Sequence, residues 1–358
     1  MGFHSYTTPV DEKVRLLRLP FSLVEAGMRA AAFEQQHATR SGFRFAKRVV
    51  IKVGTPVATH IDGNIALGRI GALVEQIAQL RQEGRDVVVI TSGAIGTGSA
   101  RMRRASILST RLGDSLDPES AQKRVDENAA AAVGQSMLMN MYETLFARYN
   151  MSCAQVLVTE SDIDDEEMMA HVRDTTAELL QLGCVPVVNE NDATTGRKEA
   201  VLSKANEVTW DNDALASKLA AELRADLLLL LTDMDGLYAQ PATGGGAPTR
   251  LACYVPRTEL ARSGLSALAT TSELRHGSSG ASGAAAGLSD EKRGEFSGRT
   301  RMAREGLAAL VDAACFATAH GVRAAVVTTG HHPRAVVRVL RGEDVGTVFL
   351  PPPAPSKL

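Results

Sequence analysis

The chain has 358 residues, 44% of them hydrophobic, and its 39 basic and 41 acidic residues give a formal net charge of −2. A chain of this length and composition can bury one large core or two smaller ones. Binding a polyanion needs excess positive charge and often stacking aromatics, so this balance, with one tryptophan and five tyrosines, argues against a nucleic-acid partner. No apolar run approaches the ~18 residues that a membrane span requires, so we expect no membrane partner either.

The cysteines and the chain ends bear on where the protein works. Four cysteines stand far apart, with no C-x-x-C pair, at positions 153, 184, 253 and 315. This spacing favours free thiols over zinc ligands or disulfides, as in the reducing cytoplasm. Residues 1–43 mix acidic and basic side chains, whereas a transit peptide is poor in acids, so we interpret them as an N-terminal extension, with import as the alternative. Residues 351–358 are interpreted as a proline-rich tail.

Strand-like and helix-like segments alternate from about residue 47, so residues 44–350 are expected to form one domain. Strands are expected at 49–53, 86–91, 154–158, 184–188, 227–231 and 322–328, and helices at 67–82, 128–149, 164–182, 211–223 and 307–320. Strands that are apolar throughout and separated by helices indicate an α/β fold with a mainly parallel sheet covered on both faces. Residues 193–210 are expected to form a loop or a polar hairpin over the site, and residues 276–289 a low-complexity surface loop.

Polar side chains stand at the end of an apolar strand or at the start of a helix at three places. They occupy residues 189–192 (Asn-Glu-Asn-Asp), residues 211–213 (Asp-Asn-Asp) and the pair Thr232-Asp233. Open α/β sheets bind ligands at the carboxyl edge of their strands. Acids beside helix N-termini at that edge can organise lysines and magnesium around phosphates. The sequence therefore predicts a phosphoryl-transfer site that lacks a Walker loop.

Two further segments lie after the first two strands. Lys52 ends the first strand and precedes Gly54 and Thr55, where a lysine can place a point charge against a phosphoryl group and a glycine lets the backbone approach. Taken alone, such a lysine is more often a solvated residue at a strand end. Ser92 opens a turn that can hold a carboxylate or phosphate, and its glycine spacing is not the dinucleotide fingerprint, which excludes a Rossmann dehydrogenase on this loop.

The sequence resembles the glutamate 5-kinases, which belong to the amino acid kinase family. The resemblance runs from about Val49 to Phe349 and rests on seven strings in the family's order: IKVGT (51–55), VVITSGAIGTG (88–98), AAVGQ (131–135), RDT (173–175), VPVVNEND (185–192), DNDALA (211–216) and LLLLTDMDGLY (228–238). It implies a three-layer αβα sandwich. Family members often carry a C-terminal PUA domain, but we expect none here, because the chain ends too early to include one. The resemblance also implies ATP- and Mg²⁺-dependent phosphorylation of the γ-carboxylate of L-glutamate, the first step of proline biosynthesis.

The resemblance also assigns roles to individual residues. It implies that the ATP-binding residues are Lys52, Gly54, Thr55, Thr232 and Asp233, and that the glutamate-binding residues are Ser92, Asp192 and Asn212. Lys52 also stabilises the transition state, and Asp213 orients it; no residue is assigned as a metal ligand. Proline is implied as a feedback inhibitor, a homo-oligomer as the assembly, and a glutamate-5-semialdehyde dehydrogenase as a candidate protein partner.

Two departures from the family pattern affect the expected ATP clamp. Family members carry a Gly-Gly-Met-x-Thr-Lys loop whose lysine reaches the ATP phosphates, but residues 298–310 keep no lysine at that place, and Pro56 lacks an N–H. Losing one preorganised donor typically costs about 3–4 kcal/mol of transition-state stabilisation. Five basic residues could compensate: Lys292, Arg293, Arg299, Arg301 and Arg304. The alternatives are a catalytically weak glutamate- or proline-binding regulatory paralogue, and a family kinase acting on aspartate, N-acetylglutamate or UMP.

Overall fold

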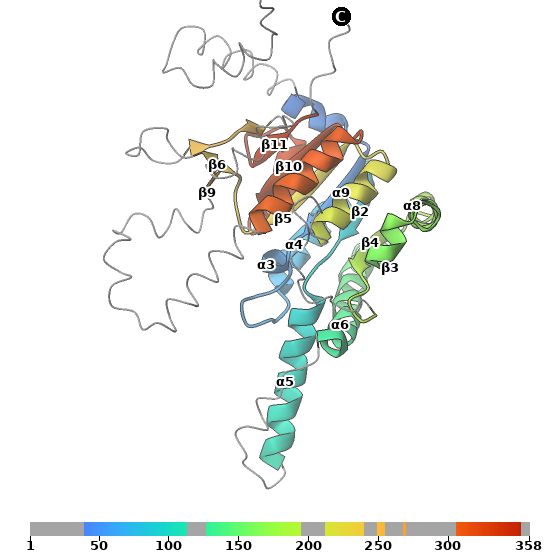
Figure 1. Cartoon of the computed structure of the whole chain (residues 1–358), viewed down its shortest axis with the longest axis vertical. Helices are drawn as coiled ribbons and strands as arrows, with labels where there is room; N and C mark the ends of the chain where they lie inside the picture. The colour runs from blue at the N-terminus through green and yellow to red at the C-terminus, as the bar shows by residue number, and fades with distance from the viewer. Residues whose placement is uncertain are drawn as a thin grey trace, which may run out of the picture.

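The computed structural model describes residues 39–112, 127–194, 212–239, 249–254, 268–269 and 306–351. Its main element is an eight-stranded sheet with the order β3-β4-β2-β1-β5-β10-β11-β8 (Figure 1). The strands in that order are Cys153–Val158, Val185–Glu190, Asp86–Ile90, Arg48–Val53, Leu227–Thr232, Ala324–Thr329, Thr347–Phe349 and Cys253–Tyr254. The six strands from β3 to β10 are parallel, and β11 runs antiparallel to β10. The mainly parallel α/β fold predicted from the sequence is thus confirmed.

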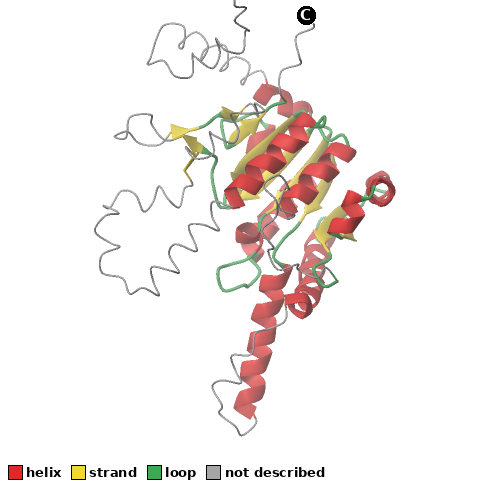
Figure 2. Cartoon of the chain, viewed as in Figure 1, coloured by secondary structure: helices red, strands yellow, loops and turns green. Residues whose placement is uncertain are grey.

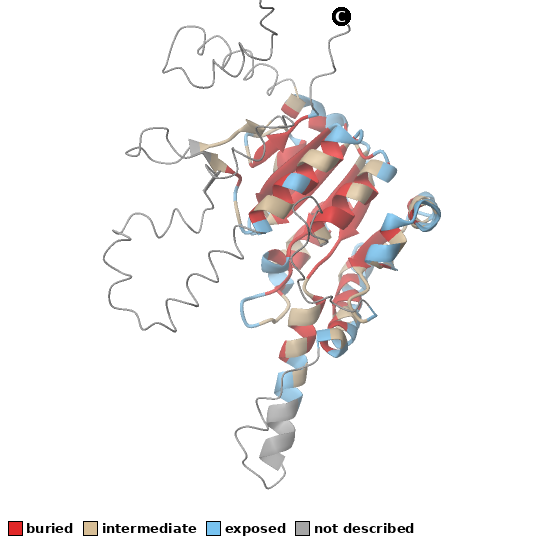
Figure 3. Cartoon of the chain, viewed as in Figure 1, coloured by how far each residue is buried: buried red, intermediate tan, exposed pale blue. Residues whose placement is uncertain are grey.

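Helices cover both faces of the sheet. Three pack on one face: α4 (Leu67–Gln82), α6 (Glu127–Ala147) and α14 (Ala335–Leu340). The other face carries α8 (Glu166–Gln181), α9 (Asn212–Glu222) and a helix at residues 306–319. Side chains alternate along β1, so that Val49 and Ile51 join the first core cluster while Val50 joins the second. The result is three layers, with the sheet buried between two sets of helices (Figure 3).

The leucine strand β5 lies at the centre of this sandwich. It pairs in parallel with β1 on one side and with β10 on the other. Its five leucines, Leu227 to Leu231, are buried. A strand with neighbours on both edges and helices on both faces contacts no water, which is why its sequence does not alternate with polar residues.

The helix expected at 164–182 is present as α8, which begins two residues later, at Glu166. A separate short helix, α7 (Glu160–Asp164), precedes it, with Asp165 between the two. Asp165 caps α8, because its Oδ1 accepts hydrogen bonds from the N–H groups of Glu167 and Met168 at 2.9 and 3.0 Å. The start of the predicted helix is therefore a cap and the end of a second helix.

The sequence also conceals α5 (Ala94–Leu112), which begins in the glycine-rich stretch after Ser92 and projects from the body of the sandwich (Figure 2). Gly98 packs against the backbone of Ala130 and Gly134 against that of Ala94. A Cβ added at either glycine would lie 1.8 Å from the facing carbonyl oxygen. These glycines are present because the two helix backbones touch, not because the chain turns.

The segment before the predicted domain also joins the core. Residues 39–42 are helical and lead into the short 3-10 helix η1 (Phe43–Phe45). Phe43 is buried in the first core cluster, and only 1% of Arg40 is exposed. A small second sheet also lies outside the expected pattern, with the order β7 (Thr249–Arg250), β6 (Tyr238–Ala239) and β9 (Leu268–Ala269).

Several expectations fall on residues outside the described ranges, namely 195–211, 276–289, 298–305 and the tail. The four cysteines are described; all are free and half-buried, and burial raises the pKa of the Cys315 thiol to about 12. Of the helices described, none is both long and apolar enough to span a membrane.

The contact between α5 and α6 can be tested with paired alanine substitutions. We expect Gly98→Ala to lower the free energy of unfolding by at least the ~1–3 kcal/mol typical of overpacking, because backbone rather than a side chain blocks the new methyl group. Gly96→Ala on the same helix is the control; its Cβ meets nothing within 4 Å, so it should stabilise by about 0.5–1 kcal/mol. Urea denaturation measures both, and equal effects would contradict the close crossing.

Candidate active site

The polar residues predicted from the sequence gather at the carboxyl edge of the sheet. β1, β2, β4 and β5 are parallel, so their final residues meet at one edge, and α9 begins there. Gly54, Thr91, Asn191 and Asp233 each directly follow one of these strands. Segments that are far apart in the chain thus deliver their polar ends to a common surface.

An ion pair joins β1 to the first turn of α9. Lys52 Nζ lies 2.7 Å from Asp213 Oδ1, and the two residues are only 9% and 7% exposed. Gly54 lies beside this pair, and a Cβ there would stand 3.8 Å from Lys52 Nζ and 2.9 Å from Leu231 O. The glycine therefore keeps space open next to the ammonium group. Asp213 fixes the direction of the lysine and balances its charge.

A second polar group links α6, β4, α9 and the turn after β2. Asn212 Nδ2 donates to Ser92 Oγ at 3.1 Å and to Asn189 Oδ1 at 3.2 Å, while Asn189 Nδ2 donates to Gln135 Oε1 at 2.6 Å. Asn212 Oδ1 is buried and accepts no hydrogen bond within the described ranges. A buried amide oxygen of this kind suits a hydrogen-bond donor on a ligand, such as an ammonium group.

A cavity of about 460 Å³ opens beside this polar group. It lies between α6 and the ends of β3 and β4, and Gln135 belongs both to its wall and to the hydrogen-bonded group. Glu190, Asn191 and Asp192 contribute to its lining. Its size falls within the range of about 300–1,000 Å³ that small-molecule sites occupy.

A buried tyrosine anchors the turn after β2. Thr91 Oγ1 and Tyr142 Oη are 3.1 Å apart, and both residues are fully buried. Burial raises the pKa of Tyr142 to about 12, so its hydroxyl stays neutral at physiological pH. Tyr142 therefore holds the Ser92 turn in place and does not exchange protons in the site.

A hydrogen bond from Gly54 joins the end of β1 to the end of β5 at the other end of the site. Gly54 N donates to Leu231 O at 2.9 Å, and Thr232 Oγ1 donates to Asp233 Oδ1 at 3.0 Å. Asp233 is exposed. Thr55 opens the short helix α3 (Thr55–Ala58), with Pro56 in its first turn, where the helix itself requires no N–H. Pro56 therefore does not disturb α3, although it offers a ligand no backbone donor.

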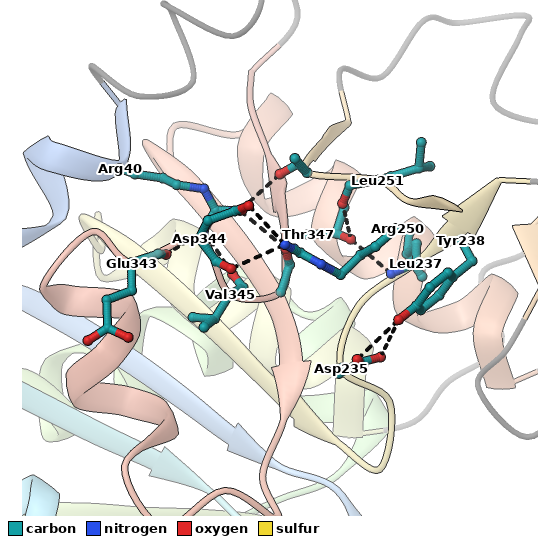
Figure 4. Close-up of polar contacts among 12 residues, drawn as sticks. Arg40, Asp235, Leu237, Tyr238, Arg250, Leu251, Glu343, Asp344, Val345 and Thr347 are labelled. Carbon is teal, nitrogen blue, oxygen red and sulfur yellow. Dashed lines mark hydrogen bonds and ion pairs between the residues drawn. The ribbon is translucent and has the colours of Figure 1, made fainter. Parts of the chain in front are cut away.

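The turn that follows Asp233 is held from behind by a hydrogen-bonded network (Figure 4). Gly236 adopts a φ of 148°, and a Cβ there would lie 3.0 Å from Thr347 Oγ1. Thr347 is fully buried; its hydroxyl accepts from Leu237 N at 2.8 Å and donates to Leu251 O at 2.6 Å. Loss of this threonine would leave two buried backbone groups without partners.

Arg40 completes the network behind this turn. Its guanidinium donates to four carbonyl oxygens, those of Ala252, Glu343, Val345 and Gly346. It also pairs with Asp344 at 3.3 Å, which in turn pairs with Arg250 at 3.0 Å. Burial lowers the pKa of Arg40, and Asp344 opposes this shift. One side chain from the start of the fold thus ties β8 to the loop before β11.

Among the residues chosen from the sequence, the structure joins Lys52 with Asp213 and Ser92 with Asn212 through direct contacts. Asp192 lines the neighbouring cavity. The sequence reasoning missed Gln135 and Asn189 as site residues. Both lie inside strings that carried the family resemblance, 131–135 and 185–192, which was the available signal.

Comparison with known proteins defines the class. Residues 47–252 match the model of the amino acid kinase family, more than half of the chain. The chain therefore belongs to the amino acid kinase family.

Two relatives differ in how much of their length this chain covers. The chain is 36% identical over 316 residues to a delta-1-pyrroline-5-carboxylate synthase of Solanum lycopersicum, covering 88% of this chain but 39% of the synthase. It is 35% identical over 312 residues to a glutamate 5-kinase of Symbiobacterium thermophilum, covering 87% of this chain and 98% of that kinase. The chain thus spans about two fifths of the plant synthase and nearly all of the bacterial kinase.

A solved isopentenyl phosphate kinase from T. acidophilum also aligns with the chain, with a TM-score of 0.47 and 12% identity over 84% of this chain and 99% of that structure. A likeness this weak supports no conclusion about substrate.

The network around Arg40 yields a stability prediction. We expect Arg40→Met to lower the free energy of unfolding by about 1–3 kcal/mol, because it leaves the carbonyl oxygen of Val345 without a donor among the described residues. The other three carbonyl oxygens keep donors, from the N–H groups of Val348 and Val345 and from the guanidinium of Arg250. Arg44→Met is the matched control, since Arg44 is exposed and lies over the Phe45 ring, at 4.7 Å from its centroid. Chemical denaturation of both variants decides; a loss below about 1 kcal/mol for Arg40→Met, or one no larger than that for Arg44→Met, would contradict the predicted role of Arg40.

Proposed function

We propose that the protein is an ATP-dependent glutamate 5-kinase that transfers the γ-phosphoryl group of ATP to the γ-carboxylate of L-glutamate, the first step of proline biosynthesis. The observation that carries the proposal is the Lys52–Asp213 pair, which lies at the same sheet edge as the Ser92–Asn212 contact. The names of the bacterial kinase and plant synthase relatives support the same reaction. We propose residues 39–350 as the kinase domain, which extends the expected 44–350 by the segment that buries Arg40 and Phe43, and the cytoplasm as its location.

Glutamate is proposed to bind between the hydrogen-bonded group around Asn212 and the adjoining cavity of about 460 Å³. The buried Asn212 Oδ1 would accept a hydrogen bond from the α-ammonium group, and the Asp192 carboxylate would add opposite charge. Ser92 Oγ, already fixed by Asn212, would hold a carboxylate oxygen. These groups would leave the γ-carboxylate pointing toward Lys52.

The proposed reaction needs charge neutralisation more than proton transfer. A glutamate γ-carboxylate is ionised at pH 7, so the nucleophile requires no general base. Catalysis then depends on holding two anions in line while positive charge faces the moving phosphoryl group. Lys52, oriented by Asp213 and unobstructed at Gly54, would supply that charge. Thr55, Thr232 and Asp233 would hold the nucleotide.

Magnesium fits this arrangement as a companion of the nucleotide. Within the described residues, no cluster of three or more histidine, cysteine or acidic side chains could hold a metal ion. Mg²⁺ at kinase sites is usually bound through phosphates, waters and one or two carboxylates, and would neutralise phosphate charge there. The missing family lysine would be replaced by Arg299, Arg301 or Arg304, which precede the helix at 306–319.

The proposal is tested by trapping the acyl phosphate with hydroxylamine in a reaction containing ATP, Mg²⁺ and glutamate. We expect γ-glutamyl hydroxamate and equimolar ADP from glutamate. Aspartate, N-acetylglutamate and UMP serve as the comparison panel. Preferred turnover of one of these would assign a different family activity, and no turnover with any would favour the regulatory alternative.

The charge role of Lys52 gives a kinetic prediction. Lys52→Met should lower kcat by about 10²-fold or more, the usual effect of removing one transition-state donor, and change the glutamate KM far less. Lys47→Met is the control. Lys47 is exposed and directly precedes β1, at the opposite end of the strand from Lys52, so this variant should keep normal kinetics. Steady-state assays with both substrates varied separate the two; a raised KM with unchanged kcat would assign Lys52 to ground-state binding.

Inhibition by proline is predicted at the glutamate site. Proline carries the same α-amino acid group that Asn212 and Asp192 would hold, so it should raise the apparent glutamate KM without lowering kcat. Asp192→Ala should relieve this inhibition. Asp164→Ala, which removes an exposed carboxylate of α7, should not. Proline that lowers kcat at saturating glutamate would place the inhibitor elsewhere.

A further inference from the structure

A second cavity, of about 370 Å³, lies on the opposite side of the β5 and β10 ends from α9. We call it the back cavity. Its wall is formed by α3, α4, α14 and the loop from Gly330 to Arg334, and all its lining residues are described. Its apolar surface includes Val57, Leu73 and Val336. Nothing in the proposed phosphoryl transfer uses this space.

The polar lining of the back cavity is basic. It contains Arg69, His60, His331 and His332, and none of the described residues that line it is an aspartate or glutamate. His332 Nδ1 accepts from the N–H of Arg334 at 3.1 Å, so its ring proton is on Nε2. Its remaining ring nitrogen is therefore a donor. A pocket lined by basic side chains, with no anionic side chain among its described residues, suits a negatively charged ligand.

Hydrogen bonds hold the walls of the back cavity in place. Arg69 Nε and Nη2 donate to the carbonyl oxygens of Val57 and Thr59 at 2.8 and 2.7 Å, which fixes α3 against α4. Gln76 Oε1 accepts from the N–H groups of Val336 and Val337 at 3.0 and 3.2 Å, which fixes α14. A preformed pocket binds at low ordering cost.

The back cavity also borders the turn proposed to bind ATP. The ring of His331 lies 3.1 Å from the carbonyl oxygen of Pro56, next to Thr55. Gly330 N donates to Thr232 O at 2.8 Å, and a Cβ at Gly330 would lie 2.6 Å from both methyl groups of Val57. The cavity thus adjoins the nucleotide turn from behind, and α3 separates the two spaces.

We propose that the back cavity binds a small organic anion, with its carboxylate or phosphate group against His60, His332 and Arg69 and its hydrocarbon body against the apolar wall. This binding site is additional to the glutamate and ATP sites. It rests on the geometry and charge of the cavity and does not depend on phosphoryl transfer.

The experiment is calorimetric titration of the full chain in the presence of saturating glutamate, which keeps the probes out of the substrate site. Benzoate and phenyl phosphate are the anionic probes and distinguish the two headgroups, and benzyl alcohol is the neutral probe of similar shape. We expect one anion or both to bind with a stoichiometry near one. We expect benzyl alcohol to bind at least about tenfold more weakly, a difference of 1.4 kcal/mol.

Two leucine substitutions on α4 locate the site. A Cβ at Gly68 meets nothing within 4 Å, so Gly68→Leu should fill the cavity without disturbing the core and abolish anion binding. Gly71→Leu, three residues further along α4, also meets nothing and does not line the cavity, so it should bind as wild type does. Thermal denaturation confirms that both variants fold.

Histidine substitutions test the charge independently of the filling variant. The double variant His60→Gln/His332→Gln should weaken anion binding, whereas His171→Gln, on exposed α8 surface, should not. The proposal is wrong if neither anion binds wild type, if benzyl alcohol binds equally well, or if Gly68→Leu and the histidine variant bind as tightly as wild type. An inactive kinase that still binds benzoate would refute only the proposed reaction, so the two failures are distinguishable.

Discussion

The pairing of Lys52 with Asp213 is the constraint around which the carboxyl edge is built. The two side chains are almost completely buried and lie 2.7 Å apart, so β1 and the start of α9 must come together for either charge to be neutralised. Replacing such a buried pair with apolar residues is often neutral or stabilising, so burial alone does not explain its presence. Lys52 is held beside Gly54, where the lack of a side chain leaves space next to the ammonium group. The pair is better explained by the positive charge that Lys52 can present to an anion. Asn212, adjacent in sequence, is positioned by the same helix start.

Much of the fold was predictable because burial leaves a clear record in the strands. Continuous apolar runs, such as the five leucines in β5 and the valines in β1 and β2, are buried on both faces only when the strands lie between two helical layers. Gly98 gave the opposite signal: read locally it is a helix breaker, yet it is a contact point between two helices. Asp165 lies at the start of the predicted helix, and the structure shows that it is the cap between α7 and α8 rather than a residue of one helix. Tertiary contact decided the first case, and the local geometry of the cap decided the second.

Some residues of the candidate site were likewise predictable from the sequence, and others were not. Lys52, Ser92, Asn212 and Asp213 were identifiable from their places after strands or at a helix start, and the structure brings them into direct contact as two pairs. Gln135 was not identifiable on its own, because it lies in the middle of a long alanine-rich helix. It reaches Asn189 only because the crossing of α5 and α6 fixes where α6 passes the end of β4. Support for a binding residue can thus lie in glycines that touch no ligand.

Arg40 has a practical consequence for defining the smallest folded unit. The family match begins at residue 47, so a fragment cut at that boundary would omit a side chain that donates to four carbonyl groups near the other end of the fold. Such a fragment would keep every candidate catalytic residue and still lose the tie between β8 and the loop that leads into β11. Limits taken from sequence similarity mark where relatives share a pattern. They need not mark where this domain becomes self-sufficient in expression or crystallisation.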